Sequence, residues 1–117
     1  MDNLKEVIIY TDGGCEPNPG RGGYGAVLRH GKHRKEISGG FRLTTNNRME
    51  LLAVIIGLEA LKNDGSGVTV YSDSKYVVEA VEKGWLHEWV KKNFGDLFIA
   101  KIIKTGYFQV CFSPDTW

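Results

Sequence analysis

Short apolar runs alternate with polar and glycine-rich segments along this chain, and the alternation predicts a domain of strands and helices. Val7-Ile8-Ile9 and Val68-Thr69-Val70 each read as a short buried strand that leads into an acidic residue. In chain order the predicted elements are strands at 7–12, 24–28 and 36–41, a helix at 46–61, a strand at 68–73 and a helix at 74–83. This order predicts an α/β fold, in which an antiparallel meander joins a mixed sheet that carries packed helices.

The pattern is less decisive after residue 84. Helical character resumes at 85–93, whereas 97–104 fits either a short buried helix or a strand. The run at 107–112 predicts a strand, which would be the fifth of the sheet. We expect one domain over residues 1–117.

The two buried strands end in similar tripeptides, Tyr10-Thr11-Asp12 and Tyr71-Ser72-Asp73. Strands of this kind, joined through intervening elements, are expected side by side, so that both aspartates emerge at the same edge of the sheet. Ligands bind at the carboxyl ends of strands in open α/β sheets. Two carboxylates held together at neutral pH repel each other unless a cation or a shared proton compensates. The repeat therefore indicates a metal-dependent site.

The composition limits the class of protein but does not identify a function. The chain has 117 residues, of which 42% are hydrophobic and 25% charged, with a formal net charge of +1. These values are ordinary for a globular domain, and we expect no membrane span, no signal peptide and a cytoplasmic location. Cys15 and Cys111 suggest neither a disulfide framework nor a zinc site. The basic cluster at 29–35 is read as a solvated turn.

Glu50 has two readings that the local sequence leaves open. It shares a helical face with Val54, Gly57 and Leu58, where an unpaired charge is costly unless it binds a metal. Alternatively, Glu50 completes a capping box in which Asn47 begins the helix. Asp12 and Asp73 likewise have local explanations as turn or cap residues.

The local explanations do not account for the convergence of all three acids on one edge of the sheet. Three carboxylates offer hard oxygen ligands, which suit Mg²⁺ or Mn²⁺ better than zinc. Two such ions, about 3.5–4 Å apart, can activate a water and stabilise the leaving oxygen in phosphodiester hydrolysis.

Polar groups that suit nucleic acid accompany the acids. The segment 13–23 reads as a glycine-rich loop, but it lacks the Gly-Lys-Ser/Thr ending of a Walker loop and precedes a strand. Asn18, between two prolines, presents an amide near Asp12, and 44–48 adds hydroxyl and amide groups near Glu50. Trp85 and Trp89 share a helical face; such a pair is more often core than a nucleic-acid platform, although lysines follow it.

Taken together, these motifs resemble ribonuclease H of the type 1 family. The resemblance covers about residues 5–96 and rests on Tyr-Thr-Asp-Gly-Gly-Cys at 10–15, Asn-Pro-Gly at 18–20, Gly-Gly-Tyr-Gly-Ala at 22–26, Thr-Thr-Asn-Asn-Arg-Met-Glu-Leu at 44–51 and Ser-Asp-Ser-Lys-Tyr-Val at 72–77. It implies the ribonuclease H fold, with the fourth strand parallel to the first and helices flanking the sheet. It also implies endonucleolytic cleavage of the RNA strand in RNA–DNA hybrids, which leaves 3′-hydroxyl and 5′-phosphate ends.

The same resemblance implies roles for individual residues. Asp12, Glu50 and Asp73 would be the catalytic acids that bind Mg²⁺, with Mn²⁺ as an alternative. The implied substrate-binding residues are Gly13, Cys15, Asn18, Thr45, Asn46, Asn47 and Trp85. Of these, the three asparagines would contact the minor groove, where the 2′-hydroxyl distinguishes RNA from DNA. No protein partner is implied.

The family pattern is not recognised after Asp96, so 97–117 reads as a divergent or truncated tail. The family's later histidine has no counterpart, because His30, His33 and His87 lie too early in the chain. The fourth acid has none either, because nothing around Asp115, the only acid in the tail, resembles its context in the family. The alternative reading is therefore an impaired or inactive remnant that at most binds hybrids. Loss of the family's last helix would expose one sheet face, which predicts a marginally stable or oligomerising protein.

Overall fold

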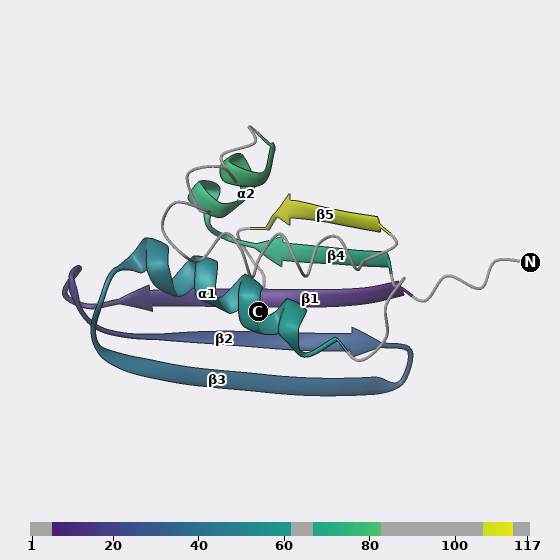
Figure 1. Ribbon diagram of the computed structural model, residues 1–117, viewed down its shortest axis with the longest axis horizontal. Helices are drawn as coiled ribbons and strands as arrows, with labels where there is room; N and C mark the ends of the chain where they lie inside the picture. Colours follow the sequence, from purple (N-terminus) through teal and green to yellow (C-terminus); the bar gives the residue numbers. More distant parts are fainter. Residues whose placement is uncertain (1–5, 62–66, 83–106, 114–117) are drawn as a thin grey trace, which may run out of the picture.

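The computed structural model describes residues 6–61, 67–82 and 107–113, which form one sheet and two helices (Figure 1). The elements in chain order are β1 (Glu6–Cys15), β2 (Gly20–His30), β3 (His33–Thr44), α1 (Asn46–Glu59), β4 (Gly67–Ser72), α2 (Lys75–Glu82) and β5 (Tyr107–Phe112). The predicted α/β class, the meander and the strand at 107–112 are confirmed. The helical and ambiguous segments predicted at 85–93 and 97–104 lie outside the described residues.

The sheet has five strands in the order β3-β2-β1-β4-β5. The hairpin partners β1–β2 and β2–β3 are antiparallel, whereas β4 is parallel to both β1 and β5. Parallel strands cannot be joined by a tight turn, and here the chain passes from β1 through β2, β3 and α1 before it reaches β4. The two strands that end in the repeated tripeptides are therefore neighbours, as predicted.

The glycine-rich segment at 13–23 is mostly strand, which corrects the loop prediction. β1 continues to Cys15 and β2 begins at Gly20, with Gly13 paired to Tyr24 and Gly14 paired to Gly23. Turn-forming residues dominate this composition, but ladder hydrogen bonds use only backbone groups, which glycine also supplies. Only the short turn at 16–19 separates the strands, and the Glu16 amide donates to the Arg21 carbonyl across it at 3.0 Å.

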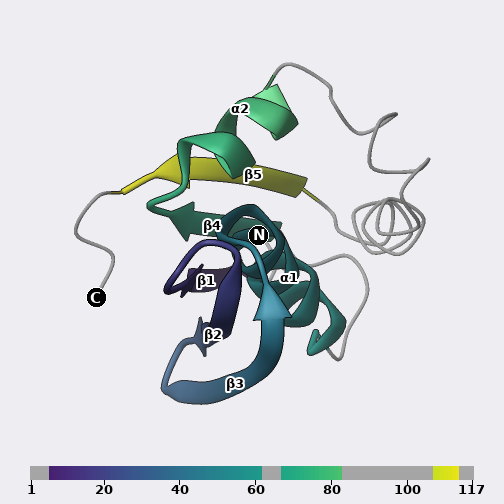
Figure 2. The ribbon, with the colours of Figure 1, turned by 90° about the vertical axis from the view of Figure 1, so that its left-hand side faces the viewer.

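One face of the sheet packs against α1 (Figure 2). Ile9 is fully buried there beneath Val54 and Leu58 of α1, both also 0% exposed. A Cβ on Gly57 would lie 2.8 Å from Cγ2 of Ile9, so this glycine lets the helix approach the sheet closely. The apolar helical stripe predicted from Val54, Gly57 and Leu58 is thus confirmed. None of the helices in the described ranges is long and apolar enough to span a membrane.

Candidate metal centre

Asp12 and Asp73 reach the site from adjacent parallel strands. Tyr10 pairs with Tyr71 and Thr11 with Ser72, so the two repeated tripeptides lie side by side in register. The two tyrosine rings stack with their centroids 5.4 Å apart, and the Thr11 hydroxyl donates to the Tyr71 carbonyl at 3.2 Å. β4 ends at Ser72, so both aspartates are exposed where the pairing of β1 with β4 stops.

Glu50 reaches the site from α1, and its position excludes the predicted capping box. The helix begins at Asn46, and Thr45 is its N-cap, because the Thr45 hydroxyl accepts the Arg48 amide at 3.3 Å. Glu50 therefore lies beyond the capping position, in the second turn. Its Oε1 atom is buried and has no hydrogen-bond partner within the part of the chain that the structure describes. The alternative in which the glutamate caps its own helix is wrong, since Thr45 already fills that role.

Close approach between α1 and β1 brings Glu50 over the sheet. A Cβ on Gly13 would lie 2.5 Å from the carbonyl carbon and oxygen of Met49 and 2.8 Å from the Glu50 amide nitrogen. Contacts that short are not tolerated, so any larger residue at 13 would push the helix away from β1. Gly13 thus sets the distance between Asp12, its neighbour in sequence, and Glu50.

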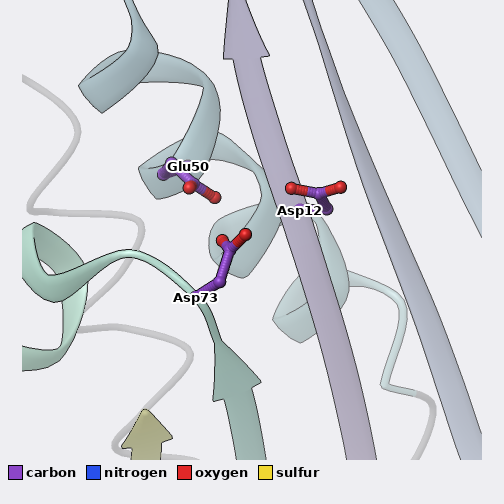
Figure 3. A group of neighbouring side chains, drawn as sticks. All are labelled: Asp12, Glu50 and Asp73. Carbon is purple, nitrogen blue, oxygen red and sulfur yellow. The ribbon is translucent and has the colours of Figure 1, made fainter. Parts of the chain in front are cut away.

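The three carboxylates form one compact cluster (Figure 3). One oxygen from each of Asp12, Glu50 and Asp73 can be chosen so that all lie within 4.8 Å of one another. Asp12 and Asp73 are exposed and Glu50 is half-buried. The cluster is therefore open on one side and supported by the helix on the other.

The electrostatics of the cluster favour a bound cation. Burial raises the pKa of Glu50 from 4.5 to about 8, and a hydrogen bond to Asp73 together with the charges of Asp73 and Asp12 adds to the rise. Burial and the Asp73 charge also raise the pKa of Asp12, against a backbone hydrogen bond from Gly13. A protein gains nothing in stability from holding three such groups together. Their all-oxygen donor set and the unpartnered Glu50 Oε1 both fit a hard divalent cation.

Three predicted substrate residues, Cys15, Asn18 and Asn46, connect the turn at 16–19 to the start of α1. The Cys15 amide donates to Oδ1 of Asn46 at 2.7 Å, and the Asn46 amide donates to Oδ1 of Asn18 at 3.2 Å. The Cys15 thiol contacts the same Asn18 oxygen at 3.3 Å and the Thr44 carbonyl at 3.5 Å. Because both side-chain oxygens accept bonds from the protein, the amide NH₂ groups of Asn18 and Asn46 are the parts left to donate outward.

The other predicted contact residues are placed as follows. Thr45 is the N-cap described above, and Asn47 is exposed in the first turn of α1. Gly13 packs beneath α1, a structural role that the sequence did not indicate, since nothing in the chain marks residues 13 and 49 as neighbours. The bracing by the asparagine oxygens was not predicted either. Trp85 lies outside the described residues.

Sequence comparison matches this chain to a family model described as RNase H and to proteins named Ribonuclease H. The family model described as RNase H matches residues 4–111, and so extends past Asp96. A protein of Syntrophus aciditrophicus named Ribonuclease H is 54% identical over 116 residues, covering 99% of this chain and 61% of its own length. One of Trichodesmium erythraeum with the same name is 60% identical over 112 residues, covering 96% of this chain and 65% of its own. The chain thus spans less than two thirds of each relative.

Solved structures agree with the sequence comparison. The N-terminal RNase H domain of a Mycobacterium tuberculosis protein superposes with a TM-score of 0.82 at 29% identity, covering 95% of this chain and 84% of that one. LC11-RNase H1, solved in complex with an RNA/DNA hybrid, gives a TM-score of 0.76 at 28% identity and covers 93% of this chain and 86% of its own. Both superpositions cover more than nine tenths of this chain.

Proposed function

The chain belongs to the ribonuclease H family, and from this we propose that it hydrolyses the RNA strand of RNA–DNA hybrids with a divalent metal ion, leaving 3′-hydroxyl and 5′-phosphate ends. The observation that carries the proposal is the carboxylate cluster, whose oxygens lie within 4.8 Å of one another. A cluster built on two strands and one helix, with an unpartnered buried oxygen, has no stabilising role in the fold. Its geometry suits a metal-dependent phosphodiesterase.

In this proposal Asp12, Glu50 and Asp73 hold the metal. Mg²⁺ is the expected ion and Mn²⁺ an alternative, because all the donors are carboxylate oxygens. The bound metal would supply an activated water and charge stabilisation at the scissile phosphate. The chain itself fixes the ligand spacing through the β1–β4 register and through the packing of Gly13 under α1. The exposed side of the cluster leaves room for substrate oxygens in the coordination shell.

Hybrid recognition is assigned to the polar rim beside the cluster. The amide oxygens of Asn18 and Asn46 already accept hydrogen bonds from the protein, so their NH₂ groups would donate to minor-groove acceptors and 2′-hydroxyls. The exposed Asn47 would do the same. Cys15 and the Thr45 hydroxyl lie beside them and would contact the sugar–phosphate backbone.

Gly13 and Trp85 complete the proposed substrate-binding set, the former beside the RNA backbone and the latter on the DNA strand. LC11-RNase H1, one of the structural neighbours, is solved with such a hybrid. A cytoplasmic location, expected from the sequence, is part of the same proposal.

Cleavage of an end-labelled RNA–DNA hybrid tests the proposal directly. We expect the RNA strand alone to be cut, with Mg²⁺ or Mn²⁺ but not with EDTA, and single-stranded RNA and duplex DNA to stay intact. Asp12→Asn should reduce the rate more than about a hundredfold, because even residues that only support metal ligands are commonly worth 10–100-fold. Glu59→Gln, which removes an exposed acid from the far end of α1, is the matched control and should cut normally.

The same assay decides between the enzyme and the alternative, a protein that binds hybrids without cutting them. A folded sample that retards the hybrid in a gel but leaves the RNA intact with both metals would support the alternative. A folded sample that neither binds nor cuts would reject both.

A further inference from the structure

A second feature lies beside the carboxylate cluster, on the face of the sheet turned away from α1. Asp12 pairs with Gly25, Gly14 with Gly23, and Gly23 with Gly40. Cross-strand partners point to the same face, as do alternate residues of one strand, so these four glycines and Asp12 share a face. Gly13 points to the other face, where Met49 of α1 occupies the space. Next to Asp12 this face of the sheet therefore carries no side chain at positions 14, 23, 25 and 40, and Ser38 is the cross-strand partner of Gly25 on it.

This glycine area overlaps a shallow trough of about 550 Å³. Its lining consists of Asp12, Tyr24 and the glycines at positions 13, 14, 23, 25 and 39. On the α1 side the corresponding space is filled, by Met49 at Gly13 and by the Tyr24 ring at Gly39. The trough thus brings Asp12 together with Gly14, Gly23 and Gly25 of the outer face.

The fold itself gives no reason for glycine at two of these positions. A Cβ on Gly25 would lie 3.8 Å from the Ile37 carbonyl oxygen, and one on Gly14 would lie 3.5 Å from Oδ1 of Asn46; both are ordinary contacts. Their backbone conformation requires no glycine either, since Gly31 is the one positive-φ glycine recorded among the described residues. Glycine in a strand weakens it, and where the fold does not need it a ligand commonly approaches the backbone.

The chemistry of the floor indicates what would lie on it. The backbone N–H and C=O groups of β1, β2 and β3 pair within the sheet, so the floor presents mainly Cα–H groups and offers no hydrogen bonds of its own. A phosphate would find no donor there. The apolar side of a sugar ring could lie directly on it, provided that no side chain intervenes.

We infer that this glycine floor is a binding subsite for the ribose next to the scissile phosphate, which lies on the backbone of β1 and β2 while Asp12 holds the metal. This rests on the proposed function, because Asp12, the residue assigned to the metal, lines the same trough. The floor accepts the sugar by close approach alone, so glycine at position 25 is needed for the substrate and not for the fold.

Substituting Gly25 separates these two requirements. Gly25→Ala and Gly25→Val are made in the full chain, and Ser38→Ala is the control, since Ser38 pairs with Gly25 on the same face but already carries a side chain. We expect both Gly25 variants to keep or raise the thermal midpoint. Alanine should raise KM for the hybrid about tenfold, the scale on which one methylene is discriminated in a fitted site, and valine should raise it further. The Mg²⁺ concentration for half-maximal rate should stay within about twofold. This control distinguishes a side chain that blocks the sugar from one that disturbs metal binding by Asp12.

An unchanged KM in both Gly25 variants would overturn the subsite while leaving the nuclease proposal in place. A lowered thermal midpoint in Gly25→Ala would also overturn it, because glycine would then serve packing within the chain. If the unaltered protein neither binds nor cuts the hybrid, the proposed function fails and takes the subsite with it.

Discussion

Replacing Glu50 by glutamine tests the electrostatic account of the metal centre most sharply. The substitution keeps the size of the side chain but removes the charge that burial and the two aspartates oppose. In the metal-free protein the pKa of Glu50 is raised to about 8, whereas in the unfolded chain it returns to 4.5. Between these values the folded state holds a proton that the unfolded state has lost, so the stability of the unaltered protein falls as pH rises from about 4.5 to 8.

The size of this effect follows from the pKa difference. At about 1.36 kcal/mol for each pKa unit, the step from 4.5 to 8 would amount to roughly 5 kcal/mol if it were expressed in full. Glu50 is only half-buried, so solvent screening reduces the expected gain of Glu50→Gln to about 2 kcal/mol above pH 8. For a domain of this length that corresponds to a rise of roughly 8 °C in thermal midpoint. At pH 5 the glutamate is already neutral in the folded state, and the gain should be small.

Thermal unfolding in EDTA at pH 5 and pH 9, followed by circular dichroism, measures both quantities. Glu59→Gln is the control for a change of net charge on the same helix, because Glu59 is exposed. Addition of Mg²⁺ at pH 9 should then stabilise the unaltered protein more than the Glu50→Gln variant. An equal effect of Glu50→Gln at both pH values, or a lower midpoint at pH 9, would show that the folded protein does not disfavour the charged form of Glu50.

Three further outcomes follow from the same contacts. The apparent Mg²⁺ affinity, measured by isothermal titration, should increase from pH 6 to about 8 and then level off, because the metal must displace the proton from Glu50; a flat profile would contradict this. Asn46→Asp keeps the oxygen that accepts the Cys15 amide but removes the outward donor, whereas Asn46→Ala removes both. The KM for the hybrid should therefore rise in both variants. The thermal midpoint should fall further in Asn46→Ala, by an amount equivalent to about 1 kcal/mol. Equal midpoints would show that the hydrogen bond from the Cys15 amide to Asn46 does not stabilise the fold. Gly57→Ala should destabilise the domain by about 1–3 kcal/mol in urea unfolding, because its Cβ would lie 2.8 Å from Cγ2 of Ile9; an unchanged midpoint would mean that α1 can shift without cost.

The predictions from sequence succeeded where the signal was local to one segment. Apolar runs ending in Asp12 and Asp73 indicated adjacent strands, and the β1–β4 register confirms that pairing residue by residue. The stripe on α1 was likewise readable, because each turn of a helix repeats the pattern of the one before. The prediction failed where the deciding group was backbone: glycines read as a loop at 13–23, but their amides and carbonyls pair as well as those of any other residue.

What the sequence by itself determined is the set of chemical groups and the order of the elements that carry them. The three carboxylates and the apolar runs that place two of them on neighbouring strands are written in the chain. The tertiary structure alone decided how those groups behave. Whether Glu50 caps a helix or enters the cluster depended on which residue began α1. Its raised pKa depends on burial and on Asp73 and Asp12, which lie far away in sequence. The glycine area beside Asp12 also exists only after pairing, since side-chain patterns do not record which glycines meet across strands.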